Sequence, residues 1–188
     1  MRKIIFQEFL SLDSYAADSD NSTKFFESAE IAEDSDDDLL REMENFDTIL
    51  LGANTYKMFV EFWPKATNDE QIVADKLNSI PKIVFSRSLK KAPWGKWPEA
   101  RIISGDAVAE IKKLKAEKGK DMVLWGSISL SQDLMKANLI DEYHFRICPV
   151  VLGAGKPLFE KTGKLELDLF ESKQYKSGLM ILKYKPRK

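Results

Sequence analysis

Two segments of this chain place a glycine directly after an apolar run and polar residues within three positions after the glycine. Gly126 and Ser127 follow the run MVLW, and Gly52 follows the run TILL and precedes Asn54 and Thr55. A helix that starts at such a point presents unpaired N–H groups and the positive end of its dipole, which together attract anions. Each junction is therefore interpreted either as an anion-binding helix start or as an ordinary strand-to-helix turn.

A third segment adds a cation to this chemistry. In FSRSL, Ser86, Arg87 and Ser88 follow an apolar run and supply hydroxyls and a guanidinium, which suit a phosphate group. Three junctions of this kind favour a shared ligand site over three unrelated turns. The chain contains neither a Walker sequence nor a G-x-G-x-x-G fingerprint at these points, so the pattern is not that of a P-loop or of the common dinucleotide fold.

The elements that carry these junctions can be read from the apolar periodicity. Short runs rich in β-branched and aromatic residues predict strands at residues 3–9, 48–51, 82–86, 101–103 and 122–125. Because helical patterns lie between these runs, we expect a mainly parallel sheet with right-handed crossovers. Ligands of such sheets bind outside the carboxyl ends of the strands, which is where the three junctions lie.

The helical patterns are defined by apolar spacing and by capping residues. The first two have apolar positions at Leu39, Leu40, Met43 and Phe46, and at Tyr56, Phe59, Val60 and Trp63. Asp106 is predicted to cap the third helix, and Ser129 with Gln132 has the capping-box spacing expected at the start of the fourth. Asn138 is a suitable end for that fourth helix.

After residue 140 the alternation of strands and helices stops. Residues 141–151, 164–170 and 177–184 are strand-like runs with no helical pattern among them. Strands joined without helices are expected to add an antiparallel edge to the sheet. The sequence therefore predicts an α/β fold with about eight strands, four or five helices and one domain over residues 1–188.

The composition excludes several classes of function. Lys plus Arg (29) nearly balances Asp plus Glu (30), so no global field favours nucleic acid or an anionic membrane. One cysteine and one histidine leave little for a thiolate zinc site or a Ser-His-Asp hydrolase, and we expect no metal. No segment has the apolar length of a membrane helix or the pattern of a signal peptide, so the cytoplasm is the expected location.

One carboxyl stands out in the acidic segment that precedes the first helical pattern. Asp36 has the spacing that places it on the same inward face as the apolar positions of that helix, whereas Asp37 and Asp38 point elsewhere. A buried carboxyl is one usual source of the proton that hydride transfer to a C=N or C=O group needs. The alternative is that the cluster only compensates the helix dipole.

The order of motifs resembles that of the dihydrofolate reductase-like fold. SLDSYAA is similar to S-L-D-G-x-I-A, LLGANTY to G-R-x-T-Y/W, and FSRSL to the S-R segment after the third strand. LWGSISL is similar to G-G-x-x-L, and LIDEYHFRICPVVLGAGKPLF contains L-I-D-E and P-V-x-L-G-x-G-x-x-L-F. The nearest resemblance is to the C-terminal reductase domain of the bifunctional deaminase-reductase of riboflavin biosynthesis and to its stand-alone bacterial relatives.

This resemblance implies a three-layer fold with helices on both faces of the sheet, and an NADPH-dependent, homodimeric reductase. By position, the implied cofactor-binding residues are Gly52, Asn54 and Thr55 at the phosphates, Ser86 and Arg87 at the 2′-phosphate, Gly126, Ser127 and Ile128 under the pyrophosphate, and Ala16 and Ala17 near the nicotinamide. The glycine at residue 126 would then let the dinucleotide pass close to the backbone. Counting back from the glycine at residue 52, Asp36 falls where dihydrofolate reductases carry their pocket carboxylate.

The sequence departs from the family pattern at three positions. Ala53 replaces an arginine, which leaves Arg87 to carry any preference for NADPH over NADH. Ser127 replaces a second glycine, so its side chain must be accommodated or used as a donor. Ser14 replaces the glycine of the D-G turn, which is expected to stiffen or shift that loop.

Two functional hypotheses from different classes follow. The first is an NADPH-dependent reductase of a small heterocycle, either pterin- or dihydrofolate-like or 5-amino-6-(5-phosphoribosylamino)uracil-like, with Asp36 as its catalytic acid. The second is a non-catalytic, dimerising, nucleotide-binding module that kept the fold and lost turnover. Cofactor titration followed by turnover assays distinguishes the two.

Overall fold

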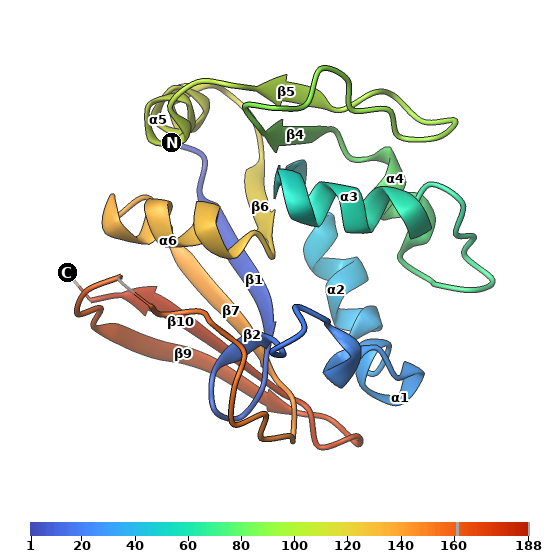
Figure 1. Ribbon diagram of the computed structural model, residues 1–188, viewed down its shortest axis with the longest axis vertical. Helices are drawn as coiled ribbons and strands as arrows, with labels where there is room; N and C mark the ends of the chain where they lie inside the picture. The colour runs from blue at the N-terminus through green and yellow to red at the C-terminus, as the bar shows by residue number, and fades with distance from the viewer. Residues whose placement is uncertain (161, 188) are drawn as a thin grey trace.

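The structure is a computed structural model that describes residues 1–160 and 162–187. Its strands are β1 (Ile4–Leu10), β2 (Tyr15–Ala17), β3 (Phe46–Gly52), β4 (Lys82–Phe85), β5 (Arg101–Ile103), β6 (Asp121–Trp125), β7 (Glu142–Ile147), β8 (Lys156–Pro157), β9 (Leu167–Gln174) and β10 (Met180–Pro186). Eight of them form one sheet in the order β5-β4-β3-β6-β1-β7-β10-β9, and β2 pairs with β8 beside it (Figure 1).

The direction of the strands agrees with the prediction. The six strands from β5 to β7 are all parallel to their neighbours. The remaining two main-sheet strands, β10 and β9, pair antiparallel and form one edge. Parallel strands need crossover helices and antiparallel ones need only a turn, so the change in sequence pattern after residue 140 reflects this change of direction.

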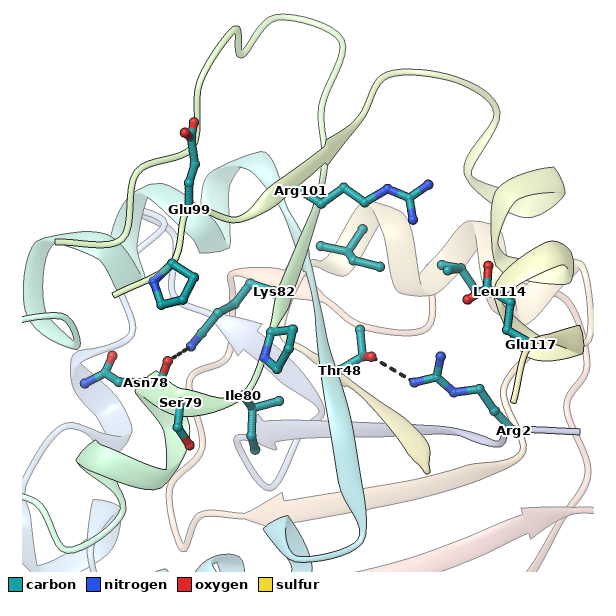
Figure 2. A pocket seen from close by; sticks show the side chains of 13 residues that line it. Arg2, Thr48, Asn78, Ser79, Ile80, Lys82, Glu99, Arg101, Leu114 and Glu117 are labelled. Carbon is teal, nitrogen blue, oxygen red and sulfur yellow. Dashed lines mark hydrogen bonds between the residues drawn. The ribbon is translucent and has the colours of Figure 1, made fainter. Parts of the chain in front are cut away.

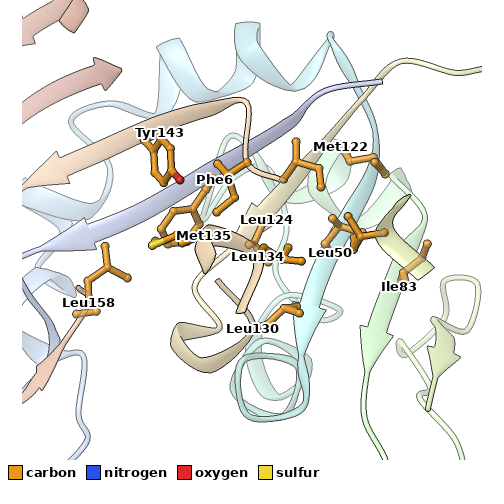
Figure 3. Packing of buried hydrophobic residues seen from close by; sticks show 14 of the residues in the cluster. Phe6, Leu50, Ile83, Met122, Leu124, Leu130, Leu134, Met135, Tyr143 and Leu158 are labelled. Atoms are coloured by element: carbon orange, nitrogen blue, oxygen red, sulfur yellow. The ribbon is translucent and has the colours of Figure 1, made fainter. Parts of the chain in front are cut away.

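The helices lie on both faces of the sheet. They are the 3₁₀ helix η1 (Lys24–Phe26) and the α-helices α1 (Ala29–Ala32), α2 (Asp36–Met43), α3 (Ala53–Phe62), α4 (Ala74–Ser79), α5 (Ala107–Ala116) and α6 (Ile128–Lys136). One core packs α5 and α6 against the face that bears Phe6 and Leu124 (Figure 3). The other packs α2, α3 and α4 against the face that bears Ile5 and Val123. This is the three-layer arrangement that the resemblance implied.

Two details of the helix prediction are wrong and one is confirmed. Phe46 continues the apolar spacing of α2 but belongs to β3, because the chain turns after Met43 and Phe46 pairs with Asp121. Ser129 does not cap α6, which begins one residue earlier with Ser127 in the N-cap position. Asp106 does cap α5, since its carboxylate accepts hydrogen bonds from the first-turn amides of that helix.

The carboxyl ends of the parallel strands meet at one edge, and the β1–β2 loop is fastened there to the β7–β8 loop. Asp13 accepts hydrogen bonds from the amides of Leu152 (3.1 Å) and Gly153 (2.7 Å). These bonds and the one from Ser11 hold the pKa of the Asp13 carboxyl below its usual range. Two sequence motifs that lie 139 or more residues apart are thus joined at the edge where ligands of such sheets bind.

Candidate active site

The two glycine-containing junctions are in direct contact at this edge. The backbone N–H of Gly52 donates to Ser127 Oγ at 2.6 Å. The backbone N–H of Ser127 in turn donates to Thr55 Oγ1 at 3.0 Å, and the two hydroxyl oxygens lie 3.1 Å apart. The starts of α3 and α6 are therefore held together by side chains, and four residues predicted for the cofactor site share one small region.

The contact between the junctions leaves little room for a side chain at either glycine. Gly126 has φ +54°, and a Cβ atom placed there would lie 3.2 Å from Thr55 Oγ1 and 3.3 Å from Thr55 Cγ2. A Cβ atom at Gly52 would lie 3.2 Å from both Cβ and Oγ of Ser127. The structure thus supplies a reason for both glycines within the protein itself, in addition to the passage of a dinucleotide that the sequence suggested.

The first amides of α3 and α6 have no acceptor within their own helix, as at every helix start. Asn54 is exposed and Ile128 is half-buried at these starts, and Thr55 is buried between them. Because Ser127 Oγ brings the two starts together, two helix dipoles present their positive ends at the same region. This arrangement suits a ligand with more than one phosphate group.

The serine and arginine after β4 have different roles. Ser86 is buried, and its hydroxyl accepts hydrogen bonds from the amides of Ser88 (3.3 Å) and Leu89 (3.1 Å), so it shapes the turn. Arg87 is exposed and forms no hydrogen bond or ion pair with any residue that the structure describes. Because β4 lies beside β3, with Phe85 opposite Gly52, Arg87 follows the neighbouring strand at the same edge as the junction of β3 with α3.

The two alanines of the first motif lie in β2 and are buried by the protein. Ala16 packs in the core on the α5 and α6 side. Gly155 approaches the backbone of Ala17 very closely. A Cβ atom at Gly155 would lie 2.1 Å from the carbonyl oxygen of Ala17. The contact therefore explains the glycine at residue 155, and the approach of the two alanines to a nicotinamide stays a prediction.

Asp36 is buried at the start of α2, on the inward face that its spacing predicted. Burial raises the pKa of its carboxyl from 3.8 to about 7, although the charge of Arg146 acts in the opposite direction. A carboxyl with this pKa is partly protonated at neutral pH and is able to donate a proton. No hydrogen bond joins Asp36 to the residues of the Ser127 region among the described residues.

The other two members of the acidic triplet behave differently from each other. Asp37 is exposed, as expected. Asp38 was expected to be a bystander on the polar face, but it binds Arg41, Lys173 and Tyr175. Burial would raise the pKa of Asp38, yet these hydrogen bonds outweigh it and lower the pKa to about 2. The difference arises because β9 and the turn after it, distant in sequence, fold against α2.

Two charged residues at this edge were missed by the sequence argument. Glu8 is buried near the end of β1, 3.8 Å from the position of a Gly126 Cβ atom, and burial raises the pKa of its carboxyl to about 8. Arg146 is buried near the end of β7. The available signal was the presence of a charged residue inside an apolar strand, in IIFQEFL and in YHFRIC.

The structure also has a cavity of about 320 Å³ at the opposite edge of the sheet (Figure 2). It lies among the amino ends of the strands and is lined by Arg2, Thr48, Lys82 and Arg101 among others. Lys82 donates to the carbonyl oxygens of Leu77 and Asn78 at 2.7 and 2.6 Å. Because this cavity lies at the amino ends of the strands, it is not the site that the chemistry at their carboxyl ends predicts.

The comparison with protein families decides between the possible relatives of this fold. A family model described as the RibD C-terminal domain matches residues 2–181. The chain belongs to the RibD C-terminal domain family. Among relatives, the uncharacterized protein YyaP of Bacillus subtilis is 31% identical over 145 residues, which are 76% of this chain and 75% of YyaP.

Solved structures support the same assignment. A Shewanella sp. PV-4 protein named for riboflavin biosynthesis is similar, with a TM-score of 0.78, 25% identity and full coverage of both chains. Dihydrofolate reductase of Enterococcus faecalis, solved in complex with NADP(H), is similar with a TM-score of 0.65 and 9% identity over 99% of this chain and 97% of that one. The RibD C-terminal domain therefore has the dihydrofolate reductase-like fold here.

The departures from the family pattern now have a structural meaning. Ser14 and Ser127, which stand at glycine positions of the pattern, have φ angles of +66° and +64°. The backbone at both positions thus keeps the left-handed conformation, which glycine adopts without strain. A serine in this conformation costs conformational free energy because it has a Cβ atom. For Ser127 the hydrogen bonds of its side chain offset that cost. Ala53 begins α3 and offers no charge to a phosphate.

Metal-binding clusters and membrane-spanning helices are both absent from the part of the chain that the structure describes. Residues 1–160 and 162–187 contain no group of three or more His, Cys, Asp or Glu side chains arranged to hold a metal ion. Within the same ranges, no helix has the length and apolar character needed to cross a membrane.

Proposed function

We propose that this protein is an NADPH-dependent reductase that transfers hydride to a small heterocyclic substrate. The observation that carries the proposal is the meeting of the α3 and α6 starts at Ser127, with the free guanidinium of Arg87 in the turn after the neighbouring strand β4. Membership of the RibD C-terminal domain family and the likeness to a reductase solved with NADP(H) support it.

The residues present fit this cofactor. The first amides of α3, which carries Asn54 and Thr55, and of α6, which starts at Ile128, would bind the phosphate groups. Arg87 would bind the 2′-phosphate that distinguishes NADPH from NADH, because a guanidinium suits bidentate phosphate contacts. The reduced nicotinamide supplies a hydride when it is bound. Ser86 would act indirectly, by shaping the turn that presents Arg87.

Asp36 would hold the proton that accompanies the hydride. Its carboxyl is buried and its pKa of about 7 keeps it partly protonated at neutral pH. A substrate ring with a C=N or C=O bond, of the pterin, dihydrofolate or aminouracil kind, would take this proton at the reduced group. The pterin and aminouracil classes are both kept in the proposal.

We further propose that the protein acts as a homodimer. The outer strand β9 is unpaired on one side, and its Leu169 and Phe170 are 52% and 44% exposed. A long edge strand with exposed apolar side chains is usually covered by a partner. Light scattering at micromolar concentration should give the mass of a dimer, and the mass of a monomer would contradict this part of the proposal.

The test of the reductase function has two stages. Quenching of protein fluorescence is first used to titrate NADPH and NADH, and NADPH is expected to bind more tightly. Oxidation of NADPH at 340 nm is then followed with a panel of pterins, dihydrofolate and aminouracils. Binding without turnover of any panel member would favour the non-catalytic nucleotide-binding module. Absence of binding would contradict both functions.

A further inference from the structure

Arg146 is buried yet only partly used by the protein. Its side chain is 3% exposed, and its Nε donates to Ser35 Oγ at 3.1 Å. Its Nη2 atom has no hydrogen-bond partner among residues 1–160 and 162–187. Only two other buried side-chain nitrogens in the described ranges share this property, Trp97 Nε1 and His144 Nδ1, and the latter lies 3.9 Å from Glu42 Oε2. An arginine that is buried is normally satisfied on both sides of its fork.

The position of Arg146 places this unused donor at the ligand-binding edge. Arg146 is the partner of Phe9 in the parallel pairing of β7 with β1, at the carboxyl ends of both strands. Its guanidinium lies over the Phe9 ring, 5.6 Å from the centroid. It shares a face of the sheet with α2, and its charge acts on the carboxyl of Asp36.

The charge balance around Arg146 does not explain why Nη2 is left free. Burial lowers the pKa of Arg146, and the charges of Glu42, Asp36 and Asp38 support the cation against it. However, Glu42 is bound by Lys183 and Gln7, and Asp38 is bound by other partners. Because a buried donor without an acceptor is costly, the natural explanation is an acceptor that comes from outside the chain.

We propose that Arg146 is a specificity-determining residue whose Nη2 donates to an oxygen atom of the substrate ring. The inference rests on the proposed reductase function and names the feature its substrate must have. The ring carries a carbonyl or anionic oxygen, and rings with amino groups in place of every oxygen are discriminated against. If the buried Nη2 faces an amino group of the ligand, two donors meet and neither finds an acceptor. Binding of such a ring is therefore strongly disfavoured.

The structure also indicates what must move for the ring to enter. Phe26 of η1 stacks on Phe9 at 4.4 Å between ring centroids, on the side of the sheet where Arg146 lies. None of the residues of η1 is buried, and the helix is only three residues long. Displacing η1 would therefore disrupt little of the core and would uncover the ring of Phe9, over which the guanidinium lies.

The test compares two planar rings of equal size, uracil and 2,4-diaminopyrimidine, in the presence of saturating NADPH. Both offer N–H groups to Asp36, but only uracil offers oxygen acceptors to Arg146. Affinities are measured by NMR titration of the full-length protein. Wild type is expected to favour uracil, and Arg146→Met is expected to weaken uracil binding about tenfold or more while diaminopyrimidine binding is retained. The matched control is Arg101→Met, at the opposite edge of the sheet.

Each outcome bears on one proposal only. If NADPH does not bind to wild type, the proposed function fails before Arg146 is tested. If NADPH binds and Arg146→Met weakens both rings equally or neither, the inference about Arg146 is overturned and the cofactor proposal stands. If Arg146→Met does not fold, Arg146→Lys is used, because its ammonium keeps the charge but ends one bond short of the position of Nη2. The same selective loss of uracil is then expected, and unchanged selectivity would overturn the inference.

Discussion

The hydroxyl of Ser127 accepts a hydrogen bond of 2.6 Å from the backbone N–H of Gly52, although 75 residues separate the two in the chain. This bond joins the end of β3 to the start of α6. It also occupies an amide that precedes the first turn of α3. The family pattern has glycine at residue 127, so this link is a feature that the serine adds.

The first prediction concerns the two effects of Ser127 on stability. Ser127→Ala removes its hydrogen bonds and keeps a side chain at φ +64°, so the free energy of unfolding should fall by about 1–2 kcal/mol. Ser127→Gly removes the same bonds but relieves the left-handed strain, so the loss should be smaller. Urea unfolding measures both values. Equal losses for the two variants would show that the strain is absent.

The second prediction tests the packing of the β7–β8 loop against β2. Gly155→Ala would place a Cβ atom 2.1 Å from Ala17 O, a backbone atom that cannot rotate away. We expect a loss of stability of about 2 kcal/mol or more. Gly153→Ala is the matched control, because it also has a positive φ but meets nothing within 4 Å, and it should cost about 1 kcal/mol. Thermal unfolding that ranks them in the reverse order would contradict the contact.

The third prediction concerns the choice of cofactor. Arg87→Ala should weaken NADPH binding by about 1–3 kcal/mol, the range for a charge-assisted hydrogen bond, and should leave NADH binding nearly unchanged. Fluorescence titration gives both affinities. Arg101→Ala, an exposed arginine at the opposite edge, should affect neither. If NADPH and NADH lose affinity equally, Arg87 does not bind the 2′-phosphate.

The fourth prediction concerns proton delivery by Asp36. Asp36→Asn should lower turnover by about 10²-fold while NADPH affinity holds, because only the ionisable group is removed. Turnover of wild type should fall as the pH rises through about 7, where the carboxyl loses its proton. Asp37→Asn is the control, since Asp37 is exposed, whereas Asp38 is held by Lys173 and Tyr175. Full activity of Asp36→Asn would leave Asp36 with a structural role alone.

The fifth prediction concerns the effect of the Asp36 carboxyl on the pH dependence of the free energy of unfolding. Because the pKa of Asp36 is raised from 3.8 to about 7 on folding, the folded state binds a proton that the unfolded chain releases above pH 4. The contribution of this proton binding to the free energy of unfolding is therefore lost as the pH rises from about 4 to about 7. Asp36→Asn should become more stable relative to wild type over this range. Glu8, whose pKa is also raised, is unchanged in the variant and cancels in the comparison. A difference that is constant with pH would contradict the raised pKa.

Local sequence patterns were sufficient for the elements and their order. Strands such as residues 122–125 are apolar because both of their faces are covered, and that pattern survives in any arrangement of the sheet. Asp106 caps its helix through bonds to residues two and three positions away, so its role is local and was predicted correctly. The three strand-end junctions were predicted at one edge because parallel strands with crossover helices all point the same way.

The tertiary structure decided how those junctions bind one another and which ionisable side chains are buried. The partner of Ser127 lies 75 residues away, and the partners of Asp38 lie on β9 and in the turn that follows it, so neither could be inferred from spacing along one helix. Glu8 and Arg146 looked like interruptions of apolar strands, and only the packed layers show that their charges lie out of water at the carboxyl edge. A pKa depends on burial and on charges in three dimensions, which a sequence specifies only through its fold.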